Sequence, residues 1–166
     1  FSYNGETNLT MTGLSLYLGE IPEQVFDGYS GTIQDTVYST SVSIKDSTIT
    51  FINVTFDGYV GIDPSTVNFT NCTFNSPVHV ATSIDVDNSS VIFQDCNFNW
   101  NSSGTSFYRL KENQRYRPKH DVALFIAGKS HVNITNSIFS DGVSCFEHAT
   151  VRAWNSTFLN GVTVGD

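Results

Sequence analysis

The sequence predicts an all-β solenoid, in which short strands wind into a stack of parallel coils. A ten-residue phrase of alternating polar and apolar residues recurs along the chain, and its clearest copies begin at Ser47, Ser65 and Ser89. Each copy closes on an apolar residue, and the intervals between these residues are 40, 18, 24, 41 and 19 positions: Leu16, Phe56, Phe74, Phe98, Phe139 and Phe158. Repeats of about 20 residues, with extra chain inserted in two of them, indicate a solenoid.

Each copy of the phrase contains two strand-like segments joined by a corner. In the copy that begins at Ser47, Ile49 and Phe51 point to one face while Thr48 and Thr50 point to the other. The corner position holds Gly, Asn or Asp in all six copies: Gly13, Asn53, Asn71, Asp95, Asn136 and Asn155. These residue types tolerate a left-handed backbone. The pattern therefore predicts a sharp bend at a fixed place in every coil, with successive coils stacked about 4.8 Å apart.

Stacked β-coils with an asparagine-type corner resemble the right-handed parallel β-helix superfamily, also called the pectin-lyase-like fold. The Phe-x-Asn runs at 51–53 and 69–71 are also similar to the short repeats of bacterial polymorphic outer-membrane and autotransporter passenger proteins. The resemblance implies a right-handed parallel β-helix, here of about six coils, in which corner asparagines can stack into a ladder of side-chain hydrogen bonds. It implies no particular activity, because such repeats describe a core and not a site.

The length of 166 residues fits a single domain that spans 1–166. Two stretches interrupt the repeat and are predicted as loop insertions, at about 17–36 and 99–121. The second contains five of the eight basic residues: Arg109, Lys111, Arg115, Arg117 and Lys119. It is either a solvated loop or a contact loop for an acidic partner or an anionic glycan. Strand-like segments lie at both ends, so we expect a longer chain or a stack of identical copies joined end to end.

Charge and hydrophobicity argue against nucleic-acid binding and against a membrane-spanning helix. The formal net charge is −8, which argues against binding to nucleic-acid phosphates, since that binding depends on clustered Lys and Arg. No run of about 20 apolar residues occurs, so no membrane-spanning helix is expected in this segment.

The motif Asn-x-Ser/Thr occurs eight times, more often than the composition alone predicts: Asn8, Asn53, Asn68, Asn71, Asn88, Asn101, Asn133 and Asn155. These sequons indicate covalent N-glycans on a secreted or cell-surface protein, although Asn, Ser and Thr also suit β-turns and exposed strand faces. Three sequons coincide with corner residues, where a ladder competes with glycosylation. We therefore rank the other five ahead of Asn53, Asn71 and Asn155 as modified sites, and Asn136, which lacks the motif, is the safer ladder member.

Cys72 and Cys96 occupy the same inward position in adjacent coils. They are either packed free thiols, which we favour, or a disulfide bridge, and Cys145 is left over.

No catalytic constellation, metal site or cofactor motif is predicted. Asp85 and Asp87 share one face of a strand and could hold a cation, but paired Asp at a strand end usually reflects turn chemistry. His79 and His131 are expected to be exposed strand residues. An outward row of threonines suggests ice binding as a minor alternative, but other residue types interrupt it.

We therefore expect a non-catalytic structural protein, an extracellular N-glycosylated β-helical rod that could serve as the head-to-tail subunit of a surface fibre. An alternative is an adhesin-like module that binds a carbohydrate or a surface through its insertions. A polysaccharide lyase or hydrolase is a further, weaker alternative, because the outward strand positions lack the convergent carboxylates that such enzymes need.

Overall fold

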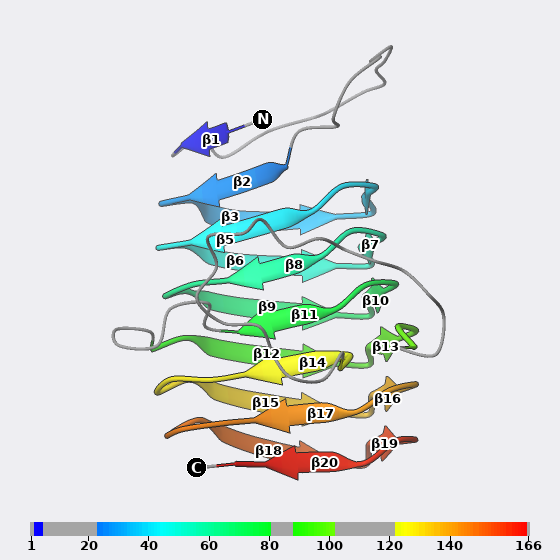
Figure 1. Ribbon diagram of the computed structural model, residues 1–166. Coiled ribbons are helices and arrows are strands. Elements are labelled where there is room, and N and C mark those ends of the chain that lie inside the picture. The colour runs from blue at the N-terminus through cyan, green and yellow to red at the C-terminus, as the bar shows by residue number, and fades with distance from the viewer. Residues whose placement is uncertain (1, 5–22, 81–87, 102–121, 166) are drawn as a thin grey trace.

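The computed structural model describes residues 2–4, 23–80, 88–101 and 122–165, and their regular elements are all β-strands (Figure 1). The strands form three parallel sheets, which we call sheets 1, 2 and 3. Sheet 1 contains, in hydrogen-bonded order, β1 (Ser2–Asn4), β2 (Gln24–Asp27), β5 (Val42–Lys45), β8 (Val60–Ile62), β11 (Val78–Val80), β14 (Leu124–Ile126), β17 (Val143–Cys145) and β20 (Val162–Val164). Sheet 2 contains β3 (Ser30–Gln34), β6 (Thr48–Ile52), β9 (Thr66–Thr70), β12 (Ser90–Gln94), β15 (His131–Thr135) and β18 (Thr150–Trp154). Sheet 3 contains β4 (Val37–Tyr38), β7 (Thr55–Phe56), β10 (Thr73–Phe74), β13 (Asn97–Phe98), β16 (Ile138–Phe139) and β19 (Thr157–Phe158).

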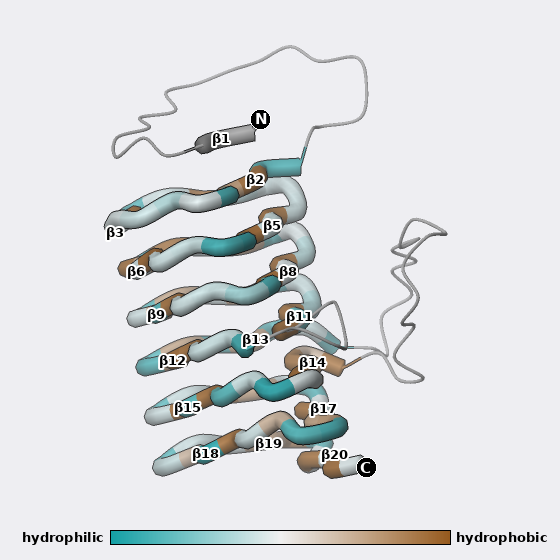
Figure 2. The backbone as a smooth tube through the Cα atoms, turned by 90° about the vertical axis from the view of Figure 1, so that its left-hand side faces the viewer, coloured by the Kyte–Doolittle hydropathy of each residue, from teal (hydrophilic) through white to brown (hydrophobic). Residues whose placement is uncertain are grey.

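The chain passes repeatedly from sheet 1 to sheet 2 to sheet 3, and each circuit forms one coil. Every strand pairs in parallel with its counterpart in the next coil, and the register matches the sequence repeat: Phe51 lies opposite Phe69, which lies opposite Phe93. The coils appear as stacked rungs in Figure 2. The prediction of an all-β protein built from regularly stacked parallel strands is therefore confirmed, and the arrangement is that of a parallel β-helix.

The predicted insertion at 17–36 is wrong for its second half, because β2 and β3 lie within it. This coil was missed because its phrase has Gly31 at an inward position where the other copies have an apolar side chain. The ring of Tyr29 fills the space instead: a Cβ atom on Gly31 would lie 2.8 Å from the Tyr29 Oη. The first copy of the phrase, at 7–16, lies outside the described residues, as does most of the predicted insertion at 99–121.

Two columns of phenylalanine rings run through the interior along the stack. In the first, Phe51, Phe69 and Phe93 stack with centroids 5.2 and 5.0 Å apart. The second column comprises Phe56, Phe74, Phe98, Phe139 and Phe158, with centroids 4.0 to 5.1 Å apart. The columns contact each other edge to face, as between Phe69 and Phe74, the geometry that ring quadrupoles favour. Identical side chains at identical positions thus give the stack its core.

Buried serines satisfy backbone donors at one bend of the coil, between sheets 1 and 2. The Ser65 hydroxyl accepts a hydrogen bond from the backbone N–H of Ser47 at 3.0 Å, and the Ser89 hydroxyl accepts one from Ser65 at 3.3 Å. The hydroxyls of buried Ser137 and partly buried Ser156 accept backbone N–H hydrogen bonds in the same way at the corner between sheets 2 and 3. A buried N–H without a partner would destabilise the fold, so these serine hydroxyls help to stabilise the bends of the coil.

Candidate functional site

The corner between sheets 2 and 3 carries a ladder of hydrogen-bonded side-chain amides and carboxylates. Its residues have left-handed φ values between 46° and 55°: Asp35, Asn53, Asn71, Asp95, Asn136 and Asn155. Five of these corners follow from the sequence pattern, and Asp35 belongs to the coil that the sequence analysis missed. The sixth predicted corner residue, Gly13, lies outside the described residues.

The corner ladder has a direction. Each amide nitrogen donates to the side-chain oxygen of the preceding coil: Asn53 to Asp35 at 2.7 Å, and Asn71 to Asn53 at 3.4 Å. A carboxylate accepts but cannot donate, so Asp95 has no N–H to offer Asn71. Within the described coils the ladder therefore comprises two runs. The second run begins at Asp95, which accepts from Asn136 at 3.1 Å, and Asn136 accepts from Asn155 at 2.7 Å.

A second amide ladder follows the closing phenylalanines, and the sequence analysis did not predict it. Asn75 donates to Asp57 at 2.7 Å, and Asn99 donates to Asn75 at 3.0 Å. This ladder also begins with an acceptor-only aspartate. The recurring Phe-Asp and Phe-Asn pairs, which close three successive phrases, were the signal that could have revealed it.

The eight sequons fall into three structural groups. Asn53, Asn71 and Asn155 lie in the corner ladder, where their amide nitrogens already donate a hydrogen bond. Asn68 and Asn133 lie in the middle of sheet 2 strands, on the outward face. The third group consists of exposed Asn88 and Asn101, which border undescribed ranges, and Asn8, which lies outside the described residues.

Asn68 and Asn133 occupy equivalent positions in one outward row of sheet 2. The register places Asn68 beside Thr50 and Ile92, and Asn133 beside Ile92 and Arg152. The two asparagines are thus two coils apart on one face. In each sequon the hydroxyl residue, Thr70 or Thr135, lies two positions further along the strand and so on the same face.

Cys72, Cys96 and Cys145 are buried free thiols. The Cys72 sulfur lies 3.4 Å from the Thr70 carbonyl oxygen, and the Cys96 sulfur lies 3.3 Å from the Gln94 carbonyl oxygen, so each thiol proton has a backbone acceptor within reach. Hydrogen bonding to Cys72 and burial together raise the pKa of the Cys96 thiol, and burial raises that of Cys145. The structure thus contains the packed-thiol arrangement rather than the bridge.

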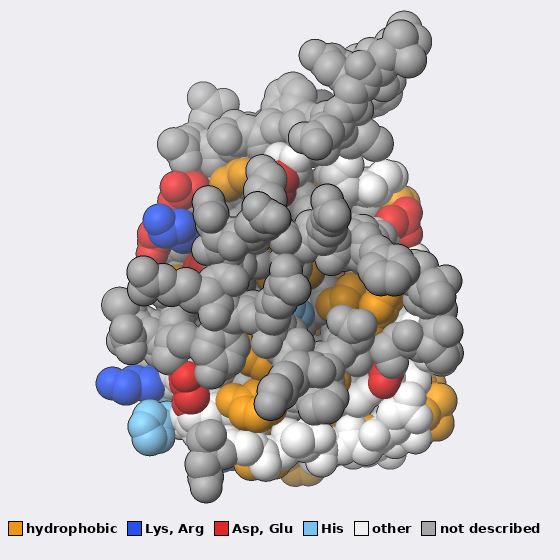
Figure 3. Space-filling view, viewed as in Figure 1, with side chains coloured by type: hydrophobic (Ala, Val, Ile, Leu, Met, Phe, Trp, Pro, Cys, Tyr) orange, Lys and Arg blue, Asp and Glu red, His pale blue; other side chains and the backbone are white. Residues whose placement is uncertain are grey.

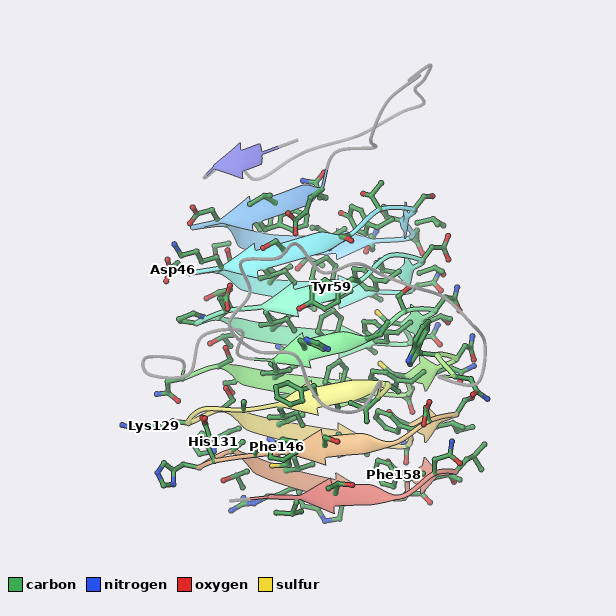
Figure 4. All side chains as sticks on the ribbon, viewed as in Figure 1. Asp46, Tyr59, Lys129, His131, Phe146 and Phe158 are labelled. Atoms are coloured by element: carbon green, nitrogen blue, oxygen red, sulfur yellow. The ribbon has the colours of Figure 1, made fainter. Side chains whose placement is uncertain are left out.

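An aromatic row crosses the outer face of sheet 1. Tyr59 contacts His79 with ring centroids 4.9 Å apart, His79 contacts Phe125 at 5.3 Å, and Phe125 contacts Phe146 at 5.6 Å. Figure 4 labels the two ends of this row, Tyr59 and Phe146, and Figure 3 shows hydrophobic side chains near the middle of the same face. His79 is therefore half-buried, contrary to the expectation that it is exposed, and burial lowers its pKa to about 4. His131 is exposed at the edge, as expected.

The predicted cation ligands Asp85 and Asp87 lie outside the described residues, as do the five basic residues of the second insertion. In the part of the chain that the structure describes, no three His, Cys, Asp or Glu side chains gather into a group that could hold a metal ion. That part also contains no helix with the length and hydrophobicity needed to cross a membrane.

The chain matches no protein-family model, no curated protein and no solved structure in the comparisons made. Its class is therefore defined by its own architecture, which is a parallel β-solenoid with amide-laddered corners and outward-facing sequons.

Proposed function

We propose that this protein is an extracellular structural glycoprotein, a β-helical rod that carries N-glycans on its outer faces. One observation carries the proposal: Asn68 and Asn133 project from sheet 2, each with its sequon threonine on the same face, and neither belongs to the amide ladders. The ordered strands beneath would hold the attached sugars at fixed positions. By the same reasoning, Asn53, Asn71 and Asn155 are poorer acceptors, because glycosylation takes place on the nitrogen that donates in the ladder.

End-to-end assembly is the second part of this proposal. The last described coil exposes side chains whose counterparts one coil earlier are buried. Val162 and Val164 are 50% and 77% exposed, whereas Val143 and Cys145 in the same columns are 1% and 5% exposed. Strands β18, β19 and β20 are also the edges of their sheets, and an edge strand can pair with a further parallel strand. A further coil could pair here, supplied either by a continuation of the same chain or by a second copy. We propose the second copy, which would make a heterologous contact that propagates into a fibre. Right-handed winding and membership of the pectin-lyase-like superfamily belong to the same proposal.

Mass spectrometry of glycopeptides tests the glycoprotein assignment. The chain would be secreted from eukaryotic cells, and occupancy measured separately at each sequon. We expect high occupancy at Asn68 and Asn133 and lower occupancy at the three corner sequons. Asn68→Gln and Asn133→Gln should each remove one glycan without affecting the other. A secreted, folded protein with both sites unmodified would refute the assignment.

Sedimentation velocity over a range of concentrations tests the assembly. Oligomers of the wild type should disappear in Val164→Lys, which places a charge in the exposed column. They should persist in Thr163→Lys, which places the same charge on the outer face of the same strand. A wild type that remains a single monomeric species at high concentration would refute end-to-end association.

A further inference from the structure

Trp154 is a large aromatic side chain that is 55% exposed on the outer face of sheet 2. It ends strand β18, and Arg152, two residues earlier on the same strand, shares its outward face. The other outward residues of the described sheet 2 strands are mostly threonine, serine, asparagine and glutamine. An exposed indole on such a polar surface is a feature that the fold itself does not require.

The register of β15 and β18 places this pair against a sequon. Asn133 lies directly opposite Arg152, and Thr135 lies directly opposite Trp154. Adjacent strands are about 4.8 Å apart, and diagonal neighbours about 7–8 Å, which is within reach of a long or aromatic side chain. The whole sequon Asn133-Ile134-Thr135 is therefore flanked by the arginine and tryptophan of the next coil.

We propose that Trp154 and Arg152 form a platform for the first sugar of the glycan on Asn133. The proposal rests on the glycosylation proposed above and adds the surface that receives the sugar. A pyranose ring has an apolar face of C–H groups, and the electron-rich face of an indole is a complementary surface. The aliphatic stem of Arg152 would cover more of the same sugar, and its guanidinium supplies donors for the acetamido oxygen of an N-acetylhexosamine.

The chain supplies its own control site. Asn68 lies on β9 in the same sheet, in the same outward row, with its sequon threonine in the same relation. In the next coil, its neighbours are Ile92 and Gln94 in place of Arg152 and Trp154. The two glycans therefore differ in whether an aromatic platform lies beside them, while the local strand geometry is the same.

A double-mutant cycle on the secreted glycoprotein tests the platform. The melting temperature would be measured for the wild type, Asn133→Gln, Trp154→Ala and the double variant. Loss of the Asn133 glycan should lower the melting temperature by about 2–4 °C when Trp154 is present, and by much less in the Trp154→Ala background. Asn68→Gln should show no such dependence on Trp154. Trp154→Phe should retain part of the coupling.

A second readout reports the contact itself. After the glycan is trimmed to its first N-acetylglucosamine, the acetamido methyl resonance at Asn133 should show a ring-current shift that is absent in Trp154→Ala. The methyl resonance of the corresponding sugar on Asn68 should be unaffected by that variant.

The outcomes separate the two proposals. An unoccupied Asn133 in a protein glycosylated at Asn68 overturns the platform and leaves the glycoprotein assignment in place. An occupied Asn133 with additive melting temperatures and no ring-current shift also overturns the platform alone. Absence of glycan at both sites refutes the proposed function.

Discussion

The side-chain amide of Asn53 donates a 2.7 Å hydrogen bond to the carboxylate of Asp35, which lies one coil earlier at the same corner. Both residues have a left-handed backbone, with φ of 55° and 53°. An aspartate can serve at this position because its carboxylate only has to accept the hydrogen bond from Asn53. A corner residue in this protein therefore has to meet two requirements. It must adopt a left-handed backbone, and its side chain must accept or donate a hydrogen bond along the ladder.

Asn136 allows these two requirements to be separated, since it lies in the ladder without being a sequon. Asn136→Ala should lower the free energy of unfolding by about 2 kcal/mol, because it forces an alanine into a left-handed conformation and removes two hydrogen bonds. Asn136→Gly should cost only about 1 kcal/mol, because glycine adopts this backbone freely and only the ladder is lost. Urea unfolding of the three proteins checks the order. Equal losses for alanine and glycine would show that the backbone conformation contributes nothing.

The two phenylalanine columns predict that the stability cost of removing a ring differs between described coils. Phe74 is fully buried between Phe56 and Phe98, so Phe74→Ala should cost about 3–5 kcal/mol. Phe158 is only partly buried and stacks on Phe139 within the last described coil, so Phe158→Ala should cost about 1–2 kcal/mol. Chemical denaturation gives both values. Similar costs at the two positions would contradict the stacked core.

His79 predicts a pH dependence of stability. Its pKa is lowered by burial from 6.5 to about 4, so the unfolded chain takes up a proton at a higher pH than the folded protein does. The contribution to stability is therefore fully present above about pH 6.5 and is lost as the pH falls towards about 4, by at most about 3 kcal/mol. His79→Phe should keep the ring contacts with Tyr59 and Phe125 and remove this component. Unfolding curves at pH 7 and pH 4.5 give the difference between the two proteins, and an identical pH dependence would refute the prediction.

The cysteines predict a simple thiol count. All three are buried, so a thiol reagent should react slowly with the native protein and should find three thiols after denaturation without reductant. Cys145→Ser should leave two. A count of one in the wild type and none in Cys145→Ser would demonstrate a bridge between Cys72 and Cys96.

The sequence alone was sufficient to predict the all-β solenoid, the corner positions from Asn53 to Asn155 and the inward columns of Phe, Ile and Val. These features are local and periodic: alternation sets the face of each side chain, and a residue that tolerates positive φ sets each bend. The same alternation and the same type of corner residue recur in each repeat, so one sequence contains several independent examples of the pattern.

The tertiary structure decided what depends on contacts between coils. It showed that Tyr29 fills the place left by Gly31, which hid a whole coil from the sequence pattern. It gave the ladders their direction and their breaks, since an aspartate and an asparagine look equivalent as corner residues but differ in their ability to donate. In the folded stack His79 is half-buried by neighbouring aromatic rings. Trp154 lies beside the sequon of Asn133 because strands β15 and β18 are paired. Register between strands is a property of the folded stack, so residues about 20 positions apart become neighbours only there.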